Sequence, residues 1–216
     1  MQLVWDMDGT LLDSGVAVPA AYVATVRELG GPPVTPAQVV ERYWLGTPEM
    51  ILADLLGQDL AVGAADDYYG RLADADVALY PGVAAVLAEL RRRGHPVAVF
   101  TGSSSRAATI LLTSAGVAAD LVVGGDQVGR PKPSGDGLVL TASRLGVPPG
   151  SLAYIGDAPN DLRAARAVGG LSAAAAWGHQ YDAAEPADVT LAAPGAALGL
   201  LDSAPWTGPP GLGDAP

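Results

Sequence analysis

Four aspartates in the sequence have the residue type and spacing of a metal site. Asp6 and Asp8 are two residues apart, so both side chains can reach one site at the end of a strand. Asp157 and Asp161 are four residues apart in a second polar segment. A cluster of carboxylates with no histidine nearby suits a hard cation with oxygen ligands, such as Mg²⁺. The sequence therefore predicts a magnesium site if the fold brings the two segments together.

The only lysine of the sequence, Lys132, lies between two prolines in the segment Arg-Pro-Lys-Pro. The chain has 12 Lys and Arg residues in total, so arginine meets every other need for a positive charge. Beside a carboxylate cluster, a lysine held in this way is typical of a fixed point charge for a phosphate group. The alternative interpretation is an ordinary solvated surface charge.

Polar segments follow short apolar runs, which predicts that the candidate residues lie at the ends of strands. We expect strands at 2–5, 96–100, 120–124, 152–155 and 171–176. Helical patterns lie between them at 83–93, 105–115, 138–145 and 161–168. Nearly continuous apolar strands that alternate with helices indicate an α/β fold, here a Rossmann-like parallel sheet with helices on both faces. Ligands bind beyond the carboxyl ends of such strands, so Asp6, Thr101 and Asp157 are expected to meet there.

One stretch, residues 14–80, interrupts this alternation with helical patterns alone. The candidate helices are 20–29, 36–44, 49–56 and 64–79. The flanking segments Asp13–Gly15 and Tyr80–Gly82 resemble paired hinges. We therefore expect an α/β catalytic core of residues 1–13 and 81–202 with an all-helical cap inserted at 14–80. Residues 203–216 are rich in Pro and Gly and are expected to form a disordered tail.

The composition limits the classes of partner and site. A net charge of −11 and an isoelectric point near 4.3 disfavour nucleic acid and anionic membranes as partners. The absence of cysteine excludes disulfides, thiolate zinc sites and thiol nucleophiles. No apolar run approaches the roughly 20 residues of a membrane-spanning helix, and no signal peptide is visible. We expect a cytoplasmic protein that is a monomer or a small homo-oligomer.

Taken together, the polar segments resemble the four motifs of the haloacid dehalogenase superfamily, in its phosphoglycolate-phosphatase-like branch with a helical cap. The matching segments are Asp6–Ser14, Phe100–Ser103, Arg130–Pro133 and Gly156–Asp161. Four motifs in this order are too specific to be a coincidence. The resemblance extends from Leu3 to about Trp177.

This resemblance implies a magnesium-dependent phosphatase that hydrolyses a small phosphorylated metabolite through an aspartyl-phosphate. Asp6 would be the nucleophile, and Asp8 would act as the general acid and then as the base. The catalytic set would be completed by Thr101 and Lys132. Mg²⁺ would be bound by the Asp6 carboxylate, the Asp8 carbonyl, Asp157 and Asp161. The phosphoryl oxygens would be held by Thr101, Gly102, Ser103 and Lys132.

Two positions depart from the commonest family pattern. Gly102 stands where Asn or Ser is frequent, which leaves only a backbone donor, and Ala158 stands where Ser or Thr is frequent. Within the predicted cap, Arg42 is the best candidate for substrate specificity, because a second anion on the substrate would favour a forked cation. Its alternative interpretation is an exposed helix charge.

Other functions on the same core remain open at this point. A sugar-phosphate mutase shares every core motif, and a regulatory protein could bind phosphorylated metabolites without turnover. A dehalogenase is disfavoured because it would not need Asp8, and a phosphonate hydrolase is excluded because the cap contains no lysine. Phosphoglycolate, a sugar phosphate, a nucleotide and pyrophosphate all remain candidate substrates.

Overall fold

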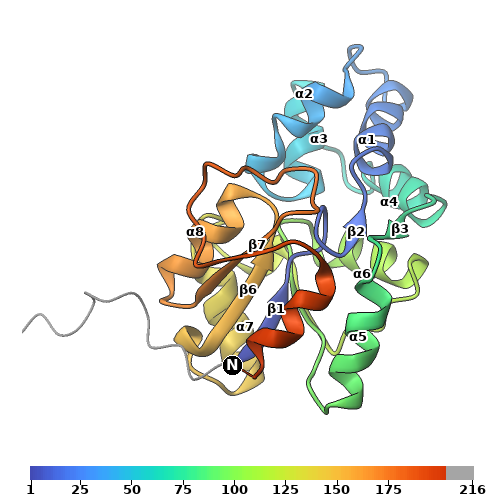
Figure 1. Ribbon diagram of the computed structural model, residues 1–216. Helices are drawn as coiled ribbons and strands as arrows, with labels where there is room; N and C mark the ends of the chain where they lie inside the picture. The colour runs from blue at the N-terminus through green and yellow to red at the C-terminus, as the bar shows by residue number, and fades with distance from the viewer. Residues whose placement is uncertain (203–216) are drawn as a thin grey trace, which may run out of the picture.

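The computed structural model describes residues 1–202, and the tail predicted at 203–216 lies outside them. A six-stranded sheet forms the centre of the described chain (Figure 1). Its strand order is β5-β4-β1-β6-β7-β8, and every neighbouring pair is parallel. The strands are β1 (Gln2–Trp5), β4 (Ala98–Phe100), β5 (Leu121–Val123), β6 (Leu152–Gly156), β7 (Leu171–Ala175) and β8 (Val189–Leu191). The predicted α/β parallel fold is confirmed, and β8 is a strand that the sequence did not predict.

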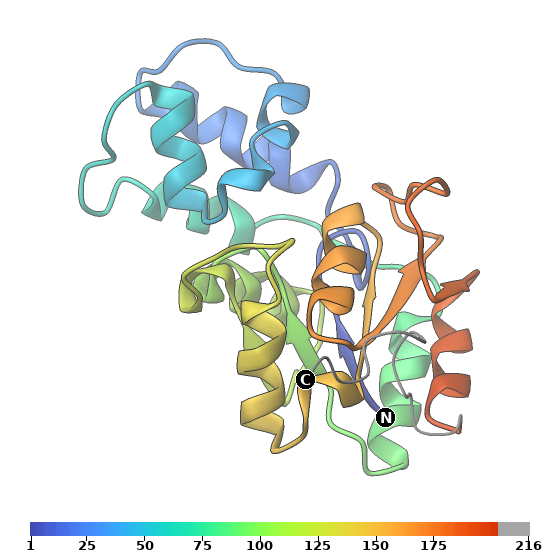
Figure 2. The same cartoon turned by 90° about the vertical axis from the view of Figure 1, so that its left-hand side faces the viewer.

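Helices cover both faces of this sheet, as its apolar strands require (Figure 2). One face packs against α7 (Asp136–Leu145) and α8 (Pro159–Ala167). The other face packs against α5 (Val83–Arg92), α6 (Ser105–Ser114) and a 3₁₀ helix at Pro194–Leu200. Successive residues of β1 serve the two faces in turn, with Leu3 and Trp5 in one apolar cluster and Val4 in the other.

Strand β1 lies where the direction of the chain across the sheet reverses. From β1 the chain proceeds to β4 and β5 on one side, and α7 then carries it back to β6 on the other side of β1. In open α/β sheets this reversal leaves a crevice beyond the carboxyl ends of the strands, where ligands bind. The residues that follow β1, β4 and β6 therefore share one edge.

Above that edge lies a helical region that follows β1 in the sequence (Figures 1 and 2). Its helices are α1 (Ala17–Glu28), α2 (Pro36–Val40), α3 (Pro48–Leu56) and α4 (Asp66–Ala73). The Thr35 hydroxyl accepts the Gln38 N–H to cap α2, which starts with a proline as α3 does. None of the helices within residues 1–202 combines the length and the apolar character needed to cross a bilayer.

Two of the predicted helices in this region are too long and must be corrected. The helix predicted at 36–44 ends at Val40 and is followed by a separate 3₁₀ turn at Tyr43–Leu45. The helix predicted at 64–79 ends at Ala73, and Ala78–Leu79 is a strand, β3. β3 pairs antiparallel with β2 (Leu12–Asp13), so a stretch that was predicted to be purely helical contains one short strand.

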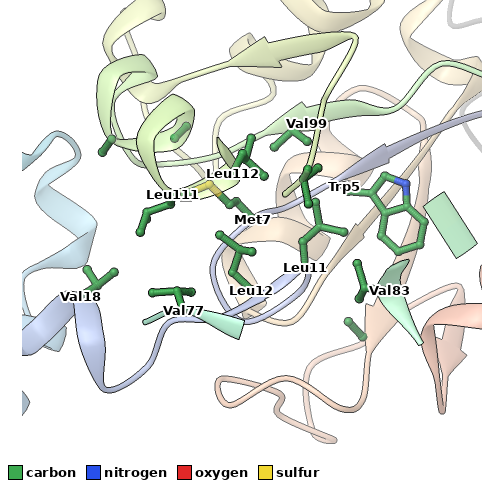
Figure 3. Packing of buried hydrophobic residues seen from close by; sticks show 14 of the residues in the cluster. Trp5, Met7, Leu11, Leu12, Val18, Val77, Val83, Val99, Leu111 and Leu112 are labelled. Atoms are coloured by element: carbon green, nitrogen blue, oxygen red, sulfur yellow. The ribbon is translucent and has the colours of Figure 1, made fainter. Parts of the chain in front are cut away.

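Apolar packing joins the base of the helical region to the sheet (Figure 3). Leu12, Val18 and Val77 lie at the junction, and Met7 and Leu111 approach them from the core. All five side chains are buried and belong to one continuous cluster. Leu12 therefore anchors the β2–β3 pair in the core, whereas Asp13 and Ala78 of the pair are exposed.

Candidate active site

The end of β1 carries the first two candidate residues into the crevice. The backbone N–H of Asp6 donates to the Ile155 carbonyl at 2.8 Å, which keeps Asp6 beside β6. A tight turn follows, in which the N–H groups of Leu11 and Leu12 both donate to the Met7 carbonyl at 2.9 Å. Asp6 and Asp8 line one cavity with the end of β4 and with the helical region.

Gly9, in this turn, is required by both conformation and space. Its φ of +82° lies in the left-handed region that side chains disfavour. A Cβ at this position would lie 2.3 Å from Oδ2 of Asp157. The absence of a side chain therefore lets the β1 turn close onto Asp157, which comes from the end of β6.

Three buried carboxylates meet at this point and form a candidate metal centre. One oxygen each of Asp6, Asp157 and Asp161 lies within 4.8 Å of the others. The three residues are only 4%, 1% and 1% exposed, respectively. A set of three carboxylates fits a hard divalent cation. The Asp8 carboxylate is not part of this cluster, and its carbonyl as a ligand stays a prediction.

The two carboxylates from the β6 side are held by hydrogen bonds. Oδ2 of Asp157 accepts the Gln180 N–H at 2.8 Å, and Oδ1 lies 3.4 Å from the Thr10 hydroxyl. Oδ2 of Asp161 accepts the Ala158 N–H at 3.0 Å at the start of α8. Burial, together with the charge of Asp161, raises the pKa of Asp157 to about 6. Such crowding of carboxylates favours a compensating positive charge.

Lys132 supplies a positive charge inside the cluster. Its Nζ lies 2.8 Å from Oδ1 of Asp6 and 2.6 Å from Oδ1 of Asp161, and its side chain is only 13% exposed. Burial alone would lower the pKa of Lys132, but Asp161 and Asp6 raise it well above its ordinary value. Burial raises the pKa of Asp6, against the opposing effect of Lys132. The interpretation of Lys132 as a solvated surface charge is wrong.

Tyr154 is a site residue that the sequence reasoning missed. Its hydroxyl donates to the Phe100 carbonyl at 2.7 Å and lies 3.2 Å from Nζ of Lys132. The phenol therefore fixes the position of the lysine relative to β4 and β6. The available signal was a tyrosine in an otherwise apolar buried strand, because a buried phenol needs a polar partner.

Asp8 has a separate partner, which the sequence reasoning did not single out. The Ser14 hydroxyl donates to Oδ1 of Asp8 at 2.6 Å. Burial raises the pKa of Asp8, although the bond from Ser14 opposes the shift. Asp8 thus faces the cavity beside the metal centre but is oriented by the start of the helical region.

The residues that follow β4 form a further part of the cavity lining. Thr101 is buried, and it lines the cavity with Gly102, Ser103 and Lys132. The Ser103 N–H donates to the Thr101 hydroxyl at 3.1 Å. The N-terminus of α6 begins directly after this segment, and its N–H groups suit an anion. The structure therefore brings together all the predicted phosphate-binding residues at one cavity.

Among the predicted site residues, Arg42 alone belongs neither to the cavity lining nor to the carboxylate cluster. Its Nε donates to Oδ2 of Asp54 at 2.6 Å, and its Nη1 donates to the Gln38 carbonyl at 2.7 Å. It is not among the residues that line the cavity, whereas its neighbours Tyr43 and Trp44 are. In this arrangement Arg42 forms an ion pair with Asp54 of α3 on the surface of the helical region.

Comparisons with known proteins place the chain in a family and identify relatives. A family model described as haloacid dehalogenase-like hydrolase matches residues 2–169. The chain is 32% identical over 203 residues to “Probable phosphatase IndB” of Dickeya dadantii, covering 85% of this chain and 86% of that protein. It is 28% identical over 209 residues to phosphoglycolate phosphatase of Escherichia coli (strain K12), covering 83% and 82%. A crystal structure of a CbbY variant from Rhodobacter sphaeroides, in complex with xylulose-(1,5)bisphosphate, superposes with a TM-score of 0.75. That match has 25% identity and covers 89% of this chain and 93% of that one.

Proposed function

Because the chain belongs to the haloacid dehalogenase-like hydrolases, we propose that it is a magnesium-dependent phosphatase that forms an aspartyl-phosphate on Asp6. The observation that carries this proposal is the position of Asp6, which lies in the carboxylate cluster, 2.8 Å from the only lysine and at the floor of a cavity. The substrate is a small phosphorylated metabolite, in keeping with the phosphatases among the relatives.

The first step transfers the phosphoryl group to the enzyme. A carboxylate oxygen of Asp6 attacks phosphorus, and the bond from phosphorus to the leaving oxygen breaks with its electron pair on that oxygen. Asp8, oriented by Ser14, donates a proton to the leaving alcohol. In the second step Asp8 takes a proton from water, whose oxygen attacks phosphorus. The bond to Asp6 breaks, and inorganic phosphate leaves.

Charge neutralisation is the main contribution of the surrounding residues. Unaided hydrolysis of phosphate monoesters is so slow that enzymes reach accelerations of up to ~10²¹. The charge of the transferred group lies on its peripheral oxygens, so fixed donors around it lower the barrier. Lys132, Thr101 and the backbone of Gly102–Ser103 would hold these oxygens. Mg²⁺, held by Asp6, Asp157, Asp161 and the Asp8 carbonyl, would neutralise charge and orient the phosphate when bound.

The helical region would act as the cap that keeps bulk water away from the aspartyl-phosphate. We assign residues 14–80 to this cap, and residues 1–13 and 81–202 to the catalytic core. The contact between α4 and α6 and the shared cavity support this division, because the cavity is lined from both sides.

The decisive experiment compares the wild type with Asp6→Asn. Asp6→Asn removes the attacking oxygen at nearly constant shape, so phosphate release from a simple alkyl phosphate with Mg²⁺ should fall at least 1,000-fold (~4 kcal/mol). Rapid quench of the wild type should trap a labelled acyl-phosphate. The matched control is Asp59→Asn, which changes an exposed aspartate of the cap and should leave the rate as in the wild type.

Three outcomes would contradict the proposal. Retention of a tenth of the single-turnover rate by Asp6→Asn would exclude the covalent step on this residue. Transfer of the phosphoryl group to a second hydroxyl without release of phosphate would identify a mutase instead. Binding without either reaction would identify a regulatory protein.

A further inference from the structure

The cavity has two chemically different ends. Its volume is about 290 Å³, which suits a small molecule. The core end presents carboxylates, hydroxyls and Lys132. The cap end presents aromatic and aliphatic side chains: Val18, Tyr22, Val40, Tyr43, Trp44, Ile51 and Tyr68. The phosphate belongs at the core end, so the leaving group must lie against the cap end.

The cap end offers no positive charge for a second anion. Among the cavity-lining residues of the described chain, Lys132 is the only cation, and it already lies between Asp6 and Asp161. The cap's Arg42 is paired with Asp54. Arg106 of α6 is paired with an aspartate of α4, at 2.6 Å from its carboxylate.

The lining of the cap end disfavours a second anion on the substrate. A carboxylate or a second phosphate placed there would lose its hydration without gaining a cation.

Aromatic side chains make up much of the cap end. The rings of Tyr22 and Tyr68 are buried, with centroids 4.3 Å apart, and form one wall. Trp44 lines the cavity from the 3₁₀ turn after α2, yet 67% of its surface is exposed. A large indole at the mouth of a cavity has one face available for stacking on a ligand.

From these contacts we infer that the substrate is a phosphate monoester whose leaving group is uncharged and carries an aromatic ring. Phosphoglycolate and sugar bisphosphates, which carry a second anion, are then poor substrates. This inference rests on the proposed function, because it takes the phosphate to be bound at Asp6 and Lys132. It adds a role for Trp44, whose indole would contact the ring of the leaving group.

The test compares three alkyl esters, so that the leaving oxygen is of the same chemical type in each. These are 2-phenylethyl phosphate, ethyl phosphate and 2-phosphoglycolate, assayed with Mg²⁺ by phosphate release. We expect kcat/KM for 2-phenylethyl phosphate to exceed that for each of the others at least tenfold. A preference for 2-phosphoglycolate would overturn the inference. If Arg42→Ala then abolished that preference, Arg42 would be the specificity residue that the sequence suggested.

Variants at the mouth of the cavity test the contact directly. Trp44→Ala should lower the ratio of kcat/KM for 2-phenylethyl over ethyl phosphate about tenfold, mainly through KM, and Trp44→Phe should restore most of it. The matched control is Met50→Ala, an exposed apolar residue of the cap that does not line the cavity and should leave the ratio as in the wild type. An unchanged ratio in Trp44→Ala would exclude the stacking contact.

Failure of the inference and failure of the proposed function give different results. If the wild type hydrolyses none of the three esters, the proposed function fails. Calorimetric titration of the wild type with the same esters then decides the inference. At least tenfold tighter binding of 2-phenylethyl phosphate than of 2-phosphoglycolate would support it, and equal or reversed affinities would overturn it.

Discussion

The Nζ atom of Lys132 lies 2.8 Å from Oδ1 of Asp6, the residue whose carboxylate is proposed to attack phosphorus. The same ammonium lies 2.6 Å from Asp161 and 3.2 Å from the Tyr154 hydroxyl, so it is held on three sides. A charge fixed in this way does not need to reorganise when the phosphoryl group is transferred. Fixed charges of this kind are among the largest contributions to enzymatic rates.

Removing this charge should reduce catalysis strongly. Lys132→Met is expected to lower kcat/KM at least about 100-fold, the scale of losing one fixed donor to the transition state. The control is Arg130→Met in the same segment, because Arg130 is exposed and pairs with Asp136. Steady-state kinetics of both variants with one substrate check the prediction. Similar losses of kcat/KM in both variants would show that catalysis depends on the conformation of the segment and not on the Lys132 ammonium.

Metal removal should abolish activity, and Mg²⁺ should restore it. Ca²⁺ is expected to inhibit, because it accepts more ligands at longer distances and can engage both oxygens of Asp6. Binding of Mg²⁺ to the native state should also raise Tm. This rise should be smaller in Asp157→Asn, which replaces one carboxylate of the cluster. Full activity after exhaustive chelation, or an equal Tm rise in the variant, would contradict the assigned metal site.

A hydrogen bond between the cap and the core should stabilise the closed arrangement. The Tyr69 hydroxyl of α4 lies 2.9 Å from the Ser104 hydroxyl at the start of α6, and the Arg106 guanidinium lies 4.0 Å from the centroid of the Tyr69 ring. Tyr69→Phe removes the hydroxyl and keeps the ring. A double-mutant cycle with Ser104→Ala, followed by urea unfolding, should give a coupling of about 1 kcal/mol. Zero coupling would show that the two hydroxyls act independently.

The stability of the cap should depend on pH through Asp67. Its carboxylate accepts bonds from Arg71 at 2.6 Å and from the Thr25 hydroxyl of α1 at 3.0 Å. The bond from Arg71, and then that from Thr25, lowers the pKa of Asp67 below 3.8. A lowered pKa contributes stability above the unfolded pKa, and this contribution is lost as pH falls through the folded value.

The matching measurement is the free energy of unfolding of Asp67→Asn across pH. Because the Asp67 side chain is 37% exposed, solvent screening limits the expected loss at pH 7 to about 0.5–1 kcal/mol. The difference from the wild type should shrink as pH falls below about 4. A difference that stays constant down to pH 2.5 would assign the effect to packing.

The parts of this protein that were predicted from sequence are those set by local patterns. The apolar runs before Asp6, Thr101 and Asp157 indicate buried strands because a parallel sheet hides both of their faces. The end of each run then places its polar residue at one edge. For Lys132 the sequence predicted a fixed charge beside the carboxylates but not the contact with Tyr154, because that contact joins positions 22 residues apart.

The errors arose where long-range partners decide the outcome. Ala78–Leu79 is a strand only because Leu12–Asp13 lies beside it, and no helical period reveals that pairing. The surroundings of Arg42, whose role the sequence left open, were likewise out of reach of local patterns, because Arg42 pairs with Asp54, 12 residues along the chain in α3. The stacking role inferred for Trp44 needed the cavity itself, since a tryptophan in a helical pattern is more often a packing residue.

The β2–β3 pairing also has an evolutionary consequence. Leu12 lies opposite Leu79, so the chain enters and leaves the cap at adjacent positions, about 5 Å apart in an antiparallel pair. The insertion therefore connects β2 and β3 in the same way as a hairpin turn would. Replacing the insertion by a shorter or different segment would leave the connections of the central sheet unchanged. The residues proposed to select the leaving group can therefore change by the replacement of one segment, while the carboxylates and the lysine proposed to perform the chemistry stay the same.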